Sequence, residues 1–559
     1  MENVIPVTMC ILMCLVVGFR ACAATELRAT EFGLAGDGTT DDGPAILRAL
    51  EAIRRMHDEA TILVFPKDKA IRAATGTDRY LLALGHMENV TIDGNGSTFL
   101  LDPNIRMADL ESARNVVLKN FHVDYTKSMF IETTIQAVDP KLGYVDVKPC
   151  DPAERDALRG PTKQDGEQWF GGFIWCGNGG QPEAARHYSV KSIEPLIGGA
   201  VRVFHGEGAF TRNIAKAISP GATRFSVPRA GVAHRRGPGA LFRIHDATDV
   251  RLEHVAVWGA PWFSFSIYRC EGSCEFRDVD VVPKPGSGRL MSGCRDAFHV
   301  TANRAKLFFD GCDTRGIGDD DYNFCTLTSV IRKVISPTQI VIRQKFPIQY
   351  NPMRVGETLM VMNAENTVLG FSKISRYAEM PAGKNEAAIP GGACPEVNVT
   401  LDDPIPGLTS GLTVWSEEAA NPDTTMRNCT ASFSVRMQTS LKIEGCRFTC
   451  YNTSYGMFPD HENVEGPGPD FIRIANSRFL TGRGAGYVAQ CGGNGPIGQT
   501  RIQRIRIEGC TFDAPLRIEK ARSITLLDNR FHGGVKIGKC ESLHMRDNTR
   551  NGSPFSLKP

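Results

Sequence analysis

The sequence lacks an excess of charge of either sign, and beyond its first residues it lacks long apolar runs. Its 64 Lys and Arg residues nearly balance its 62 Asp and Glu residues, which gives a formal net charge of +2. This balance argues against a nucleic-acid-binding protein and against a polybasic protein of membrane surfaces. No later segment approaches the roughly 20 apolar residues that span a bilayer, so we expect no transmembrane segment beyond the N-terminal leader.

The leader is the one apolar exception. An apolar stretch runs over Val4–Phe19 and is followed by small residues, with an A-x-A site at Ala21–Ala23. This pattern predicts a signal peptide over 1–24 and an exported protein, which would be periplasmic, at the cell surface or secreted. An uncleaved anchor is the alternative, because little positive charge precedes the stretch and Arg20 lies close to the cleavage site.

Long helical patterns are also scarce, whereas glycine and proline are frequent, with 56 and 32 residues. In the C-terminal third, four segments share one pattern, a short apolar run, a turn residue and another apolar residue. They start 31, 33 and 19 residues apart. Recurrence of this kind is the signature of a stacked solenoid. The segments are IEGCRF (Ile443–Phe448), IANSRF (Ile474–Phe479), IEGCTF (Ile507–Phe512) and LLDNRF (Leu526–Phe531).

Short strands with frequent turns, and no helix between them, predict an all-β fold, a right-handed parallel β-helix with coils stacked at roughly 4.8 Å. Cys312, Cys446 and Cys510 hold equivalent places in their units, so we expect them in an inward ladder that suits small apolar thiols. Three of the 17 cysteines lie in the leader, which leaves 17 − 3 = 14. Disulfides among these are the alternative in an exported protein.

The open end of a solenoid needs a cover, and the sequence offers one near its start. A turn at Gly36–Gly38 precedes a predicted helix that carries Ile46, Ala49, Leu50 and Ile53 on one face. An amphipathic helix of this kind can cap the first coil.

Two stretches break the repeat with alternating strands and turns, such as the turn at Lys141–Gly143. Both predict antiparallel β insertions, and insertions on a repeat scaffold tend to gather around the binding face. The expected organisation is a signal peptide (1–24), a cap with the first coils (25–130), a β insertion (131–240), coils with the candidate catalytic residues (241–325), a second insertion (326–420) and C-terminal coils (421–559).

The segment GIGDDDYNFC (316–325) places three carboxylates side by side. Asp296 precedes Asp319 by 319 − 296 = 23 residues, about one coil, so stacked turns would bring these two carboxylates close together, with Asp320 beside them. Neighbouring side chains alternate in an extended segment, so at most two of Asp319, Asp320 and Asp321 should face one pocket.

Clustered carboxylates suit glycoside hydrolysis, in which one carboxylic acid protonates the leaving oxygen and another carboxylate acts against the sugar. Crowding also raises the proton affinity of one member, which keeps an acid protonated near neutral pH. From the residues alone, a calcium site and a solvated turn are the alternatives.

Three motifs lie in and before this region: PKPGSGRL (Pro283–Leu290), DAFH (Asp296–His299) and DDDYN (Asp319–Asn323). With them the chain resembles exported pectate-lyase-like β-helix proteins, and within these glycoside hydrolase family 110. The resemblance implies removal of terminal α-1,3-linked galactose with inversion. It also implies that Asp296, Asp319 and Asp320 are the catalytic carboxylates, with Asp296 as the acid and Asp319 or Asp320 as the base.

Further residues are candidates for substrate binding. Arg289 matches the family arginine and could bind a sugar hydroxyl, although arginine also fixes turns. His299 could orient a carboxylate or be an interior histidine, and Asn323 belongs to the DDDYN segment. Trp258 and Trp262 could form an apolar platform for a sugar or belong to the core. Arg436 and Asp460 lie on later coils from which they might reach the pocket.

The favoured function is an exported, exo-acting α-galactosidase that needs no metal or cofactor and takes a glycan with terminal galactose as its partner. One alternative is another β-helix enzyme that degrades polysaccharides, and a non-catalytic carbohydrate-binding β-helix is a second. A polysaccharide lyase is disfavoured, because it would use a Lys or Arg base with calcium, whereas close carboxylates suit hydrolysis.

Overall fold

The computed structural model describes most of the chain from residue 24 onward. The described residues are 24–56, 59–158, 172–175, 186–188, 190–205, 218–229, 239–344, 353–363, 368–379, 396–432, 435–449, 454–455, 466, 468–480, 489–491, 504–518, 521–538 and 540–557.

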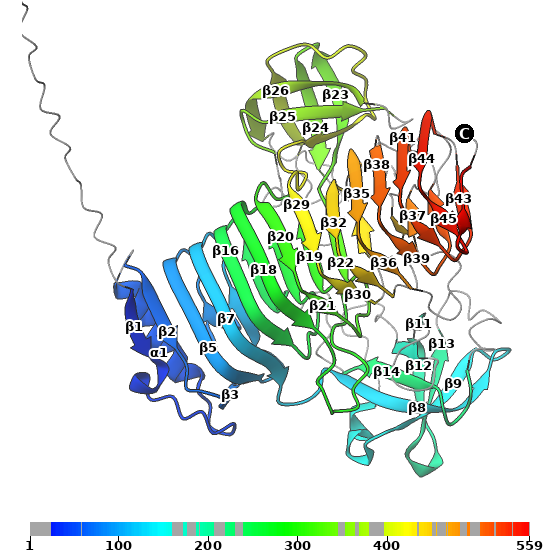
Figure 1. The fold of residues 1–559 in the computed structure, drawn as a ribbon. Helices are drawn as coiled ribbons and strands as arrows, with labels where there is room; N and C mark the ends of the chain where they lie inside the picture. Colours follow the sequence, from blue (N-terminus) through cyan, green and yellow to red (C-terminus); the bar gives the residue numbers. More distant parts are fainter. Residues whose placement is uncertain are drawn as a thin grey trace, which may run out of the picture.

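The chain forms a parallel β-helix, as predicted, and its rungs stack from the N-terminal to the C-terminal end (Figure 1). Within the described residues the largest sheet has 22 strands, which pair in parallel except for β45 with β46. Its strands are β1 (Thr25–Arg28), β2 (Thr61–Val64), β3 (Ala70–Ala73), β5 (Glu88–Leu101), β7 (Arg114–Tyr125), β16 (Thr248–Val257), β18 (Glu271–Val281), β20 (Lys306–Asp310), β21 (Asp313–Thr314), β29 (Thr424–Arg427), β30 (Thr430–Ala431), β32 (Leu441–Glu444), β33 (Arg447–Phe448), β35 (Phe471–Ala475), β36 (Arg478–Phe479), β38 (Arg504–Glu508), β39 (Thr511–Phe512), β41 (Ser523–Leu527), β42 (Arg530–Phe531), β44 (Ser542–Arg546), β45 (Thr549–Arg550) and β46 (Ser553–Pro554).

Two further parallel sheets complete the rungs. A seven-stranded sheet serves the first part of the helix and a four-stranded sheet the last part, counted over the described residues. The seven strands are β4 (Tyr80–Ala83), β6 (Arg106–Asp109), β15 (Phe242–His245), β17 (Phe265–Tyr268), β19 (Phe298–Thr301), β22 (Tyr322–Cys325) and β31 (Val435–Met437). The four are β34 (Ser454–Tyr455), β37 (Ala489–Cys491), β40 (Leu516–Ile518) and β43 (Val535–Ile537).

The repeated six-residue pattern encodes one bend of the rung. Its turn position is left-handed in every copy, with φ of 63° at Gly445, 50° at Asn476, 63° at Gly509 and 50° at Asp528. Glycine, asparagine and aspartate are the residues that adopt this conformation most readily, which explains why they alternate at this place.

The residue after each bend points inward and bonds the next rung. Cys446 N–H donates to Ser477 Oγ (3.0 Å), Ser477 N–H to Cys510 Sγ (3.4 Å), and Cys510 N–H to Asn529 Oδ1 (2.9 Å). Cys312 is also fully buried, and these cysteines are free thiols. The ladder satisfies backbone N–H groups that the bend removes from the sheet.

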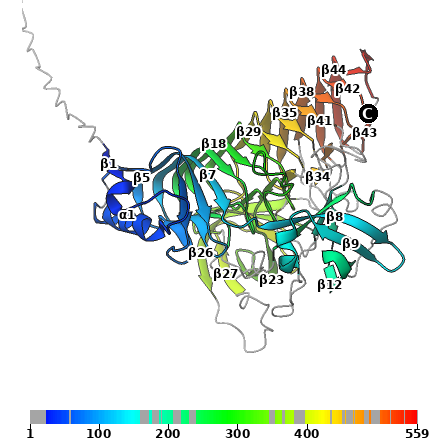
Figure 2. The ribbon, with the colours of Figure 1, turned by 90° about the horizontal axis from the view of Figure 1, so that it is seen from below.

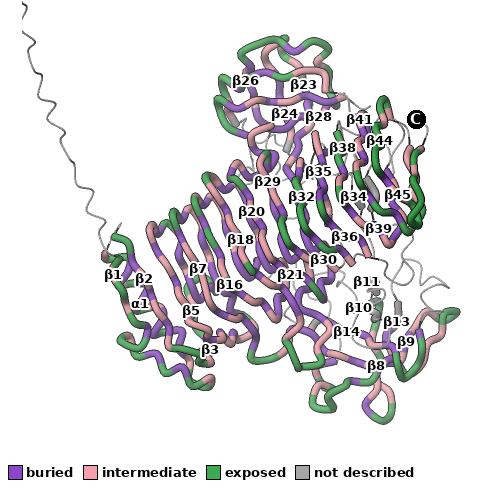
Figure 3. Tube along the Cα trace, viewed as in Figure 1, coloured by how far each residue is buried: buried purple, intermediate pink, exposed green. Residues whose placement is uncertain are grey.

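Stacked aromatic rings fill the interior beneath the seven-stranded sheet. Phe265 and Phe298 have ring centroids 4.9 Å apart at 8°, and Phe298 and Tyr322 have centroids 4.9 Å apart at 9°. In Figure 3 buried and less buried residues alternate along the strands. This alternation fixes which side chains of each strand reach the outer face.

The first rung is closed by helix α1 (Gly43–Arg55), whose buried face includes Ile46, Ala49, Leu50 and Ile53, as predicted (Figure 1). At the other end the chain turns back, and Phe555 packs edge-to-face on Phe531 with centroids 5.8 Å apart. No helix in the described part of the chain is long and apolar enough to cross a membrane.

Two antiparallel units emerge from the rungs, and Figure 2 shows both on the side of the helix away from the 22-stranded sheet. The first is a sheet between β7 and β15, and the second is a closed barrel between β22 and β29. The sheet contains β8 (Phe130–Asp139), β9 (Tyr144–Pro149), β10 (Gly172–Trp175), β11 (Arg186–Tyr188), β12 (Val190–Pro195), β13 (Val201–His205) and β14 (Arg224–Pro228). The barrel contains β23 (Ser329–Ser336), β24 (Gln339–Gln344), β25 (Thr358–Met362), β26 (Val368–Glu379), β27 (Glu396–Leu401) and β28 (Thr413–Ser416).

Candidate active site

The candidate site lies at the turns that join the 22-stranded sheet to the seven-stranded sheet on three successive rungs. These turns run from β16 to β17, from β18 to β19 and from β21 to β22. They pair through their backbones, since Ser264 N–H donates to the Asp296 carbonyl and Ala297 N–H donates to the Asp320 carbonyl, both at 3.0 Å. On the preceding rung the antiparallel sheet takes the place of this turn.

The structure brings the three predicted carboxylates together. One oxygen from each of Asp296, Asp319 and Asp320 lies within 4.8 Å of the other two. The register differs by one residue from the expected one, because β19 and β22 pair with a step of 322 − 298 = 24 residues. Asp296 is therefore level with Asp320, and Arg295 is level with Asp319.

Asp296 is the most enclosed member of the cluster, with 4% of its side chain exposed. His299 Nδ1 lies 2.7 Å from Asp296 Oδ2 and forms a hydrogen bond with it. Burial, and then the negative charge of Asp319, raise the pKa of Asp296 against the opposing effect of His299. A buried carboxyl with a raised pKa is suited to carry a proton near neutral pH and to donate it.

Asp319 has a different environment. It forms an ion pair with Arg295, whose guanidinium carbon lies 4.8 Å from the ring centroid of Trp262. The Arg295 guanidinium thus lies between the Trp262 indole of the preceding rung and the Asp319 carboxylate of the following rung. With 30% of its side chain exposed, Asp319 has a fixed countercharge and access to water.

Asp320 and Asp321 point in opposite directions. Arg436 Nη1, from β31, lies 3.6 Å from Asp320 Oδ2, and 10% of the Asp320 side chain is exposed. Asp321 takes the inward position and is fully buried. Two of the three consecutive aspartates therefore belong to the cluster, as expected in number. They are the adjacent Asp319 and Asp320, because residues 318–321 form a bend before β22 and not an extended strand.

A polar row on the outer face of the seven-stranded sheet adjoins the carboxylates. His299, Asn323 and Arg436 lie in register on β19, β22 and β31. The ring of Phe263 stacks on His299 with centroids 4.4 Å apart at 11°, which fixes the imidazole. Asn323 is 2% exposed, and its Oδ1 accepts no hydrogen bond from any described residue. Such a buried acceptor is suited to a substrate hydroxyl.

The PKPGSGRL loop is held by two buried carboxylates. Arg289 Nη1 lies 2.7 Å from Asp124 Oδ1, and Lys284 Nζ lies 3.1 Å from Oδ2 of the same residue. Leu290 N–H donates to Glu132 Oε1 at 2.9 Å, and burial raises the pKa of Glu132. Arg289 thus fixes the loop that leads to Arg295 and Asp296.

The two tryptophans have separate surroundings. Trp262 contacts Arg295 and belongs to the carboxylate cluster. Trp258 stacks on His122 with centroids 4.7 Å apart at 15°, and Lys284 Nζ lies 5.2 Å from its ring centroid. The structure therefore places Trp262, and not Trp258, against a partner of the catalytic candidates.

Three residues of the site were missed from the sequence. Arg295 had a signal, since 319 − 295 = 24 matches the rung spacing to Asp319. Phe263 and Glu132 had none, because their contacts join residues 36 and 158 positions apart (299 − 263, 290 − 132). Asp460 lies outside the described residues.

The charged groups around the three aspartates determine whether the cluster can bind a metal ion. The spacing of three carboxylate oxygens within 4.8 Å would suit a cation. Each carboxylate already has its own partner, however: Arg295, Arg436 or the imidazole of His299. A divalent ion would be repelled by two neighbouring guanidinium groups. The arrangement therefore suits proton transfer better than metal binding.

Curated relatives are α-1,3-galactosidases. The chain is 25% identical over 462 residues to α-1,3-galactosidase B of Bacteroides thetaiotaomicron, which covers 77% of this chain and 70% of the relative. It is 24% identical to α-1,3-galactosidase A of Shewanella woodyi (54% and 51% covered) and 22% identical to α-1,3-galactosidase B of Akkermansia muciniphila (68% and 47% covered). The chain spans only about half the length of these last two. No protein-family model matches it.

Solved structures give a weaker likeness. The Streptococcus pneumoniae surface adhesin PfbA matches at 10% identity and a TM-score of 0.40, with 95% of this chain and 93% of that chain covered. An exopolygalacturonase from Thermotoga maritima matches at 11% identity and a TM-score of 0.33, with 95% and 92% covered. These low scores support no statement about function.

Proposed function

We propose that the chain is an exported, exo-acting glycoside hydrolase that removes terminal α-1,3-linked galactose from glycans with inversion of configuration. The observation that carries the proposal is the cluster of Asp296, Asp319 and Asp320, in which one carboxyl is buried with a raised pKa and the others have arginine partners. The named relatives support the choice of sugar and linkage.

In the proposed reaction Asp296 gives its proton to the glycosidic oxygen as the bond from that oxygen to the anomeric carbon breaks. Asp319 takes a proton from a water molecule, whose oxygen forms the new bond to the anomeric carbon. The products are galactose and the shortened glycan. Asp296 is left ionised and Asp319 protonated, and solvent restores both. Arg295 and His299 position these two groups.

Exo-action is supported by where the antiparallel sheet emerges. The sheet replaces the turn one rung before the catalytic turns, and Glu132 of β8 binds the backbone at Leu290. A wall at this end of the site favours a substrate that enters by its terminus. Export is proposed from the leader pattern alone.

The separation of the catalytic carboxyl groups determines whether the configuration at the anomeric carbon is inverted or retained. Inverting enzymes separate their carboxyl groups by roughly 6.5–9.5 Å and retaining enzymes by roughly 5–5.5 Å. The 4.8 Å limit joins single oxygens, so it marks closest approach and not the separation of whole groups. The resemblance to family 110 supports inversion.

The deciding experiment is anomer-resolved proton NMR during digestion of a terminal α-1,3-galactosyl oligosaccharide. We expect β-galactose to appear first and to mutarotate afterwards. If α-galactose appears first, the hydrolase is retaining and Asp319 acts as a nucleophile. If no sugar is released from a broad panel of glycans, the proposed function is wrong.

Metal removal should leave this activity intact. Because both ionised members of the cluster have arginine partners, we expect the protein dialysed against a chelator to keep its full kcat/KM. Adding Ca²⁺ back should change nothing. Loss of activity that Ca²⁺ restores would contradict the charge argument and would make the carboxylates metal ligands.

A further inference from the structure

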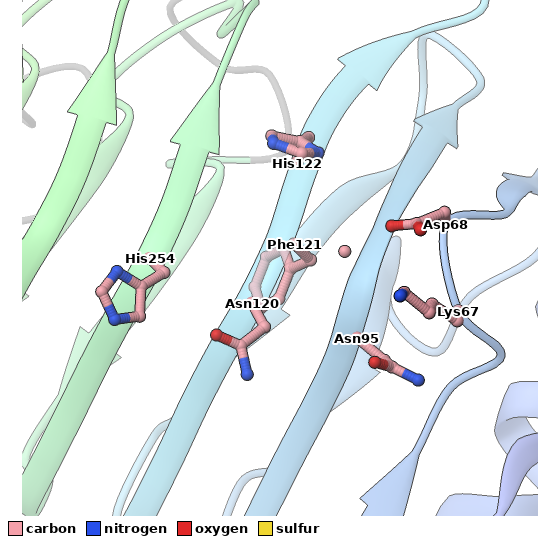
Figure 4. Close-up of a pocket in the computed structure, with 8 residues that line it drawn as sticks. Lys67, Asp68, Asn95, Asn120, Phe121, His122 and His254 are labelled. Carbon is pink, nitrogen blue, oxygen red and sulfur yellow. The ribbon is translucent and has the colours of Figure 1, made fainter.

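A hollow with polar side chains at its rim lies on the outer face of the 22-stranded sheet, apart from the carboxylate cluster. It has a volume of about 360 Å³ and spans β5, β7 and β16. Figure 4 shows Lys67 and Asp68 on one side, His254 on the other, and Asn95, Asn120 and His122 on the strands between them. Its size falls in the range of small-molecule sites, roughly 300–1,000 Å³.

The hollow follows from the same left-handed bend that defines the rungs. Asn95, Asn120 and His254 occupy this bend on three successive rungs, with φ of 50°, 60° and 52°. Their side chains therefore lie in a row across the sheet. A Cβ at Gly96 would lie 2.3 Å from Asp68 Oδ1, so only glycine there lets this carboxylate reach over β5.

The polar atoms offer both donors and acceptors in fixed positions. Asn95 and Asn120 donate their amide groups to the Phe65 carbonyl (3.3 Å) and to Asp93 Oδ1 (3.0 Å), which orients their own oxygens as acceptors. His122 is held on Trp258 by ring stacking.

The charge inventory indicates a neutral ligand. The lining contains one ammonium, on Lys67, and one carboxylate, on Asp68. Burial lowers the pKa of His122, which keeps its imidazole neutral, and His254 Nδ1 lies 3.3 Å from Asp278 Oδ2. Among the lining side chains the ammonium of Lys67 is matched by the carboxylate of Asp68, and the mixed fixed donors and acceptors match the hydroxyl groups of a sugar.

The hollow is joined to the candidate active site by direct contacts. His122 stacks on Trp258, Trp258 meets Lys284, and Lys284 shares Asp124 with Arg289 on the loop that leads to Asp296. Trp258, which the sequence suggested as a sugar platform, thus contacts His122 of the hollow instead of the carboxylates.

We propose that this hollow is a second carbohydrate-binding site, which takes a neutral mono- or disaccharide unit of the glycan that the active site trims. The inference rests on the proposed function for its ligand class. Such a site holds a branched or surface-bound glycan near the enzyme while the carboxylates act on its termini, and it raises the effective concentration of those termini.

The test uses lactose, a neutral disaccharide without α-linked galactose, titrated into the full-length Asp296→Asn variant and followed by saturation-transfer NMR. We expect saturable binding that Lys67→Ala and His122→Ala each weaken by about tenfold, the effect of one or two lost hydrogen bonds. Lys442→Ala and His544→Ala are matched controls, because both residues lie on later rungs of the same sheet.

A crystal soaked with lactose gives the second readout. Sugar density in the hollow supports the proposal. Density only among the carboxylates, or affinities that the hollow variants leave unchanged, overturns it. The outcome is independent of catalysis, since absence of sugar release by the wild type would refute the hydrolase and leave the lactose titration interpretable. Lys67→Ala should also hydrolyse a small soluble trisaccharide at the wild-type rate.

Discussion

Replacement of Asp296 by Asn is expected to lower kcat/KM for a terminal α-1,3-galactosyl oligosaccharide by about 1,000-fold while the protein remains folded. The amide has nearly the shape of the carboxyl but carries no transferable proton, so the natural leaving group departs unprotonated. Loss of a general acid typically costs roughly 10²–10⁴ in rate. Galactose release measures the effect, and thermal unfolding shows whether the fold is kept.

The leaving group distinguishes an acid from any other role of Asp296. A nitrophenyl α-galactoside has a leaving group that needs little protonation, so Asp296→Asn should slow its hydrolysis much less than that of the oligosaccharide. Equal losses on both substrates would contradict the role of acid. Asp528→Asn is the matched control, since Asp528 is exposed at a bend where Asn476 occurs on another rung, and it should leave both rates unchanged.

Much of the fold was predictable because each rung repeats the same short sequence pattern. In the C-terminal rungs the bend is occupied by glycine, asparagine or aspartate, the next position carries a small inward side chain, and an apolar ring follows, as in IEGCRF and IEGCTF. This local sequence pattern also predicted the thiol ladder through Cys446 and Cys510. The pattern holds for rungs of any length, because the length of a rung is determined by the turns that join its strands.

The sequence did not reveal the length of each rung, and this caused the one-residue error in the expected alignment of the aspartates. Paired positions on successive rungs are 24 residues apart from Leu252 to Phe276, 33 from Phe276 to Phe309 and 19 from Ile507 to Leu526. With no constant period, the count from Asp296 could be matched to Asp319 or to Asp320. The set of carboxylates was therefore predicted, but their level on the rungs was not.

The partners of the carboxylates were harder to assign from the sequence. Arg436 was a candidate for the pocket, and it lies 3.6 Å from Asp320 although 436 − 320 = 116 residues separate them, but nothing in the sequence paired these two residues or Phe263 with His299. Only the stacking of turns makes these pairs. The same stacking places Trp258 against His122 and not against the cluster. No pattern in WGAPWF indicates this placement.

Asp319→Asn is expected to lower kcat/KM by about 1,000-fold, as much as Asp296→Asn, because an amide cannot take a proton from water. Unlike Asp296→Asn, it should slow the nitrophenyl galactoside and the oligosaccharide alike, since both need activated water. Asp320→Asn is the comparison. Because the Asp320 side chain is 10% exposed and forms an ion pair with Arg436, we expect it to position the substrate, so its loss should appear mainly in KM.

The pH profile separates the two aspartates further. Activity falls as pH rises through the pKa of the acid, because Asp296 must be protonated to act. The charge of Asp319 raises that pKa, so Asp319→Asn should move the alkaline limb of the residual kcat/KM to lower pH. Arg295→Met should move it to higher pH, since Arg295 opposes the rise. An alkaline limb that stays in place in both variants would show that Asp296 does not titrate within this cluster, and the assignment of the acid would fall with it.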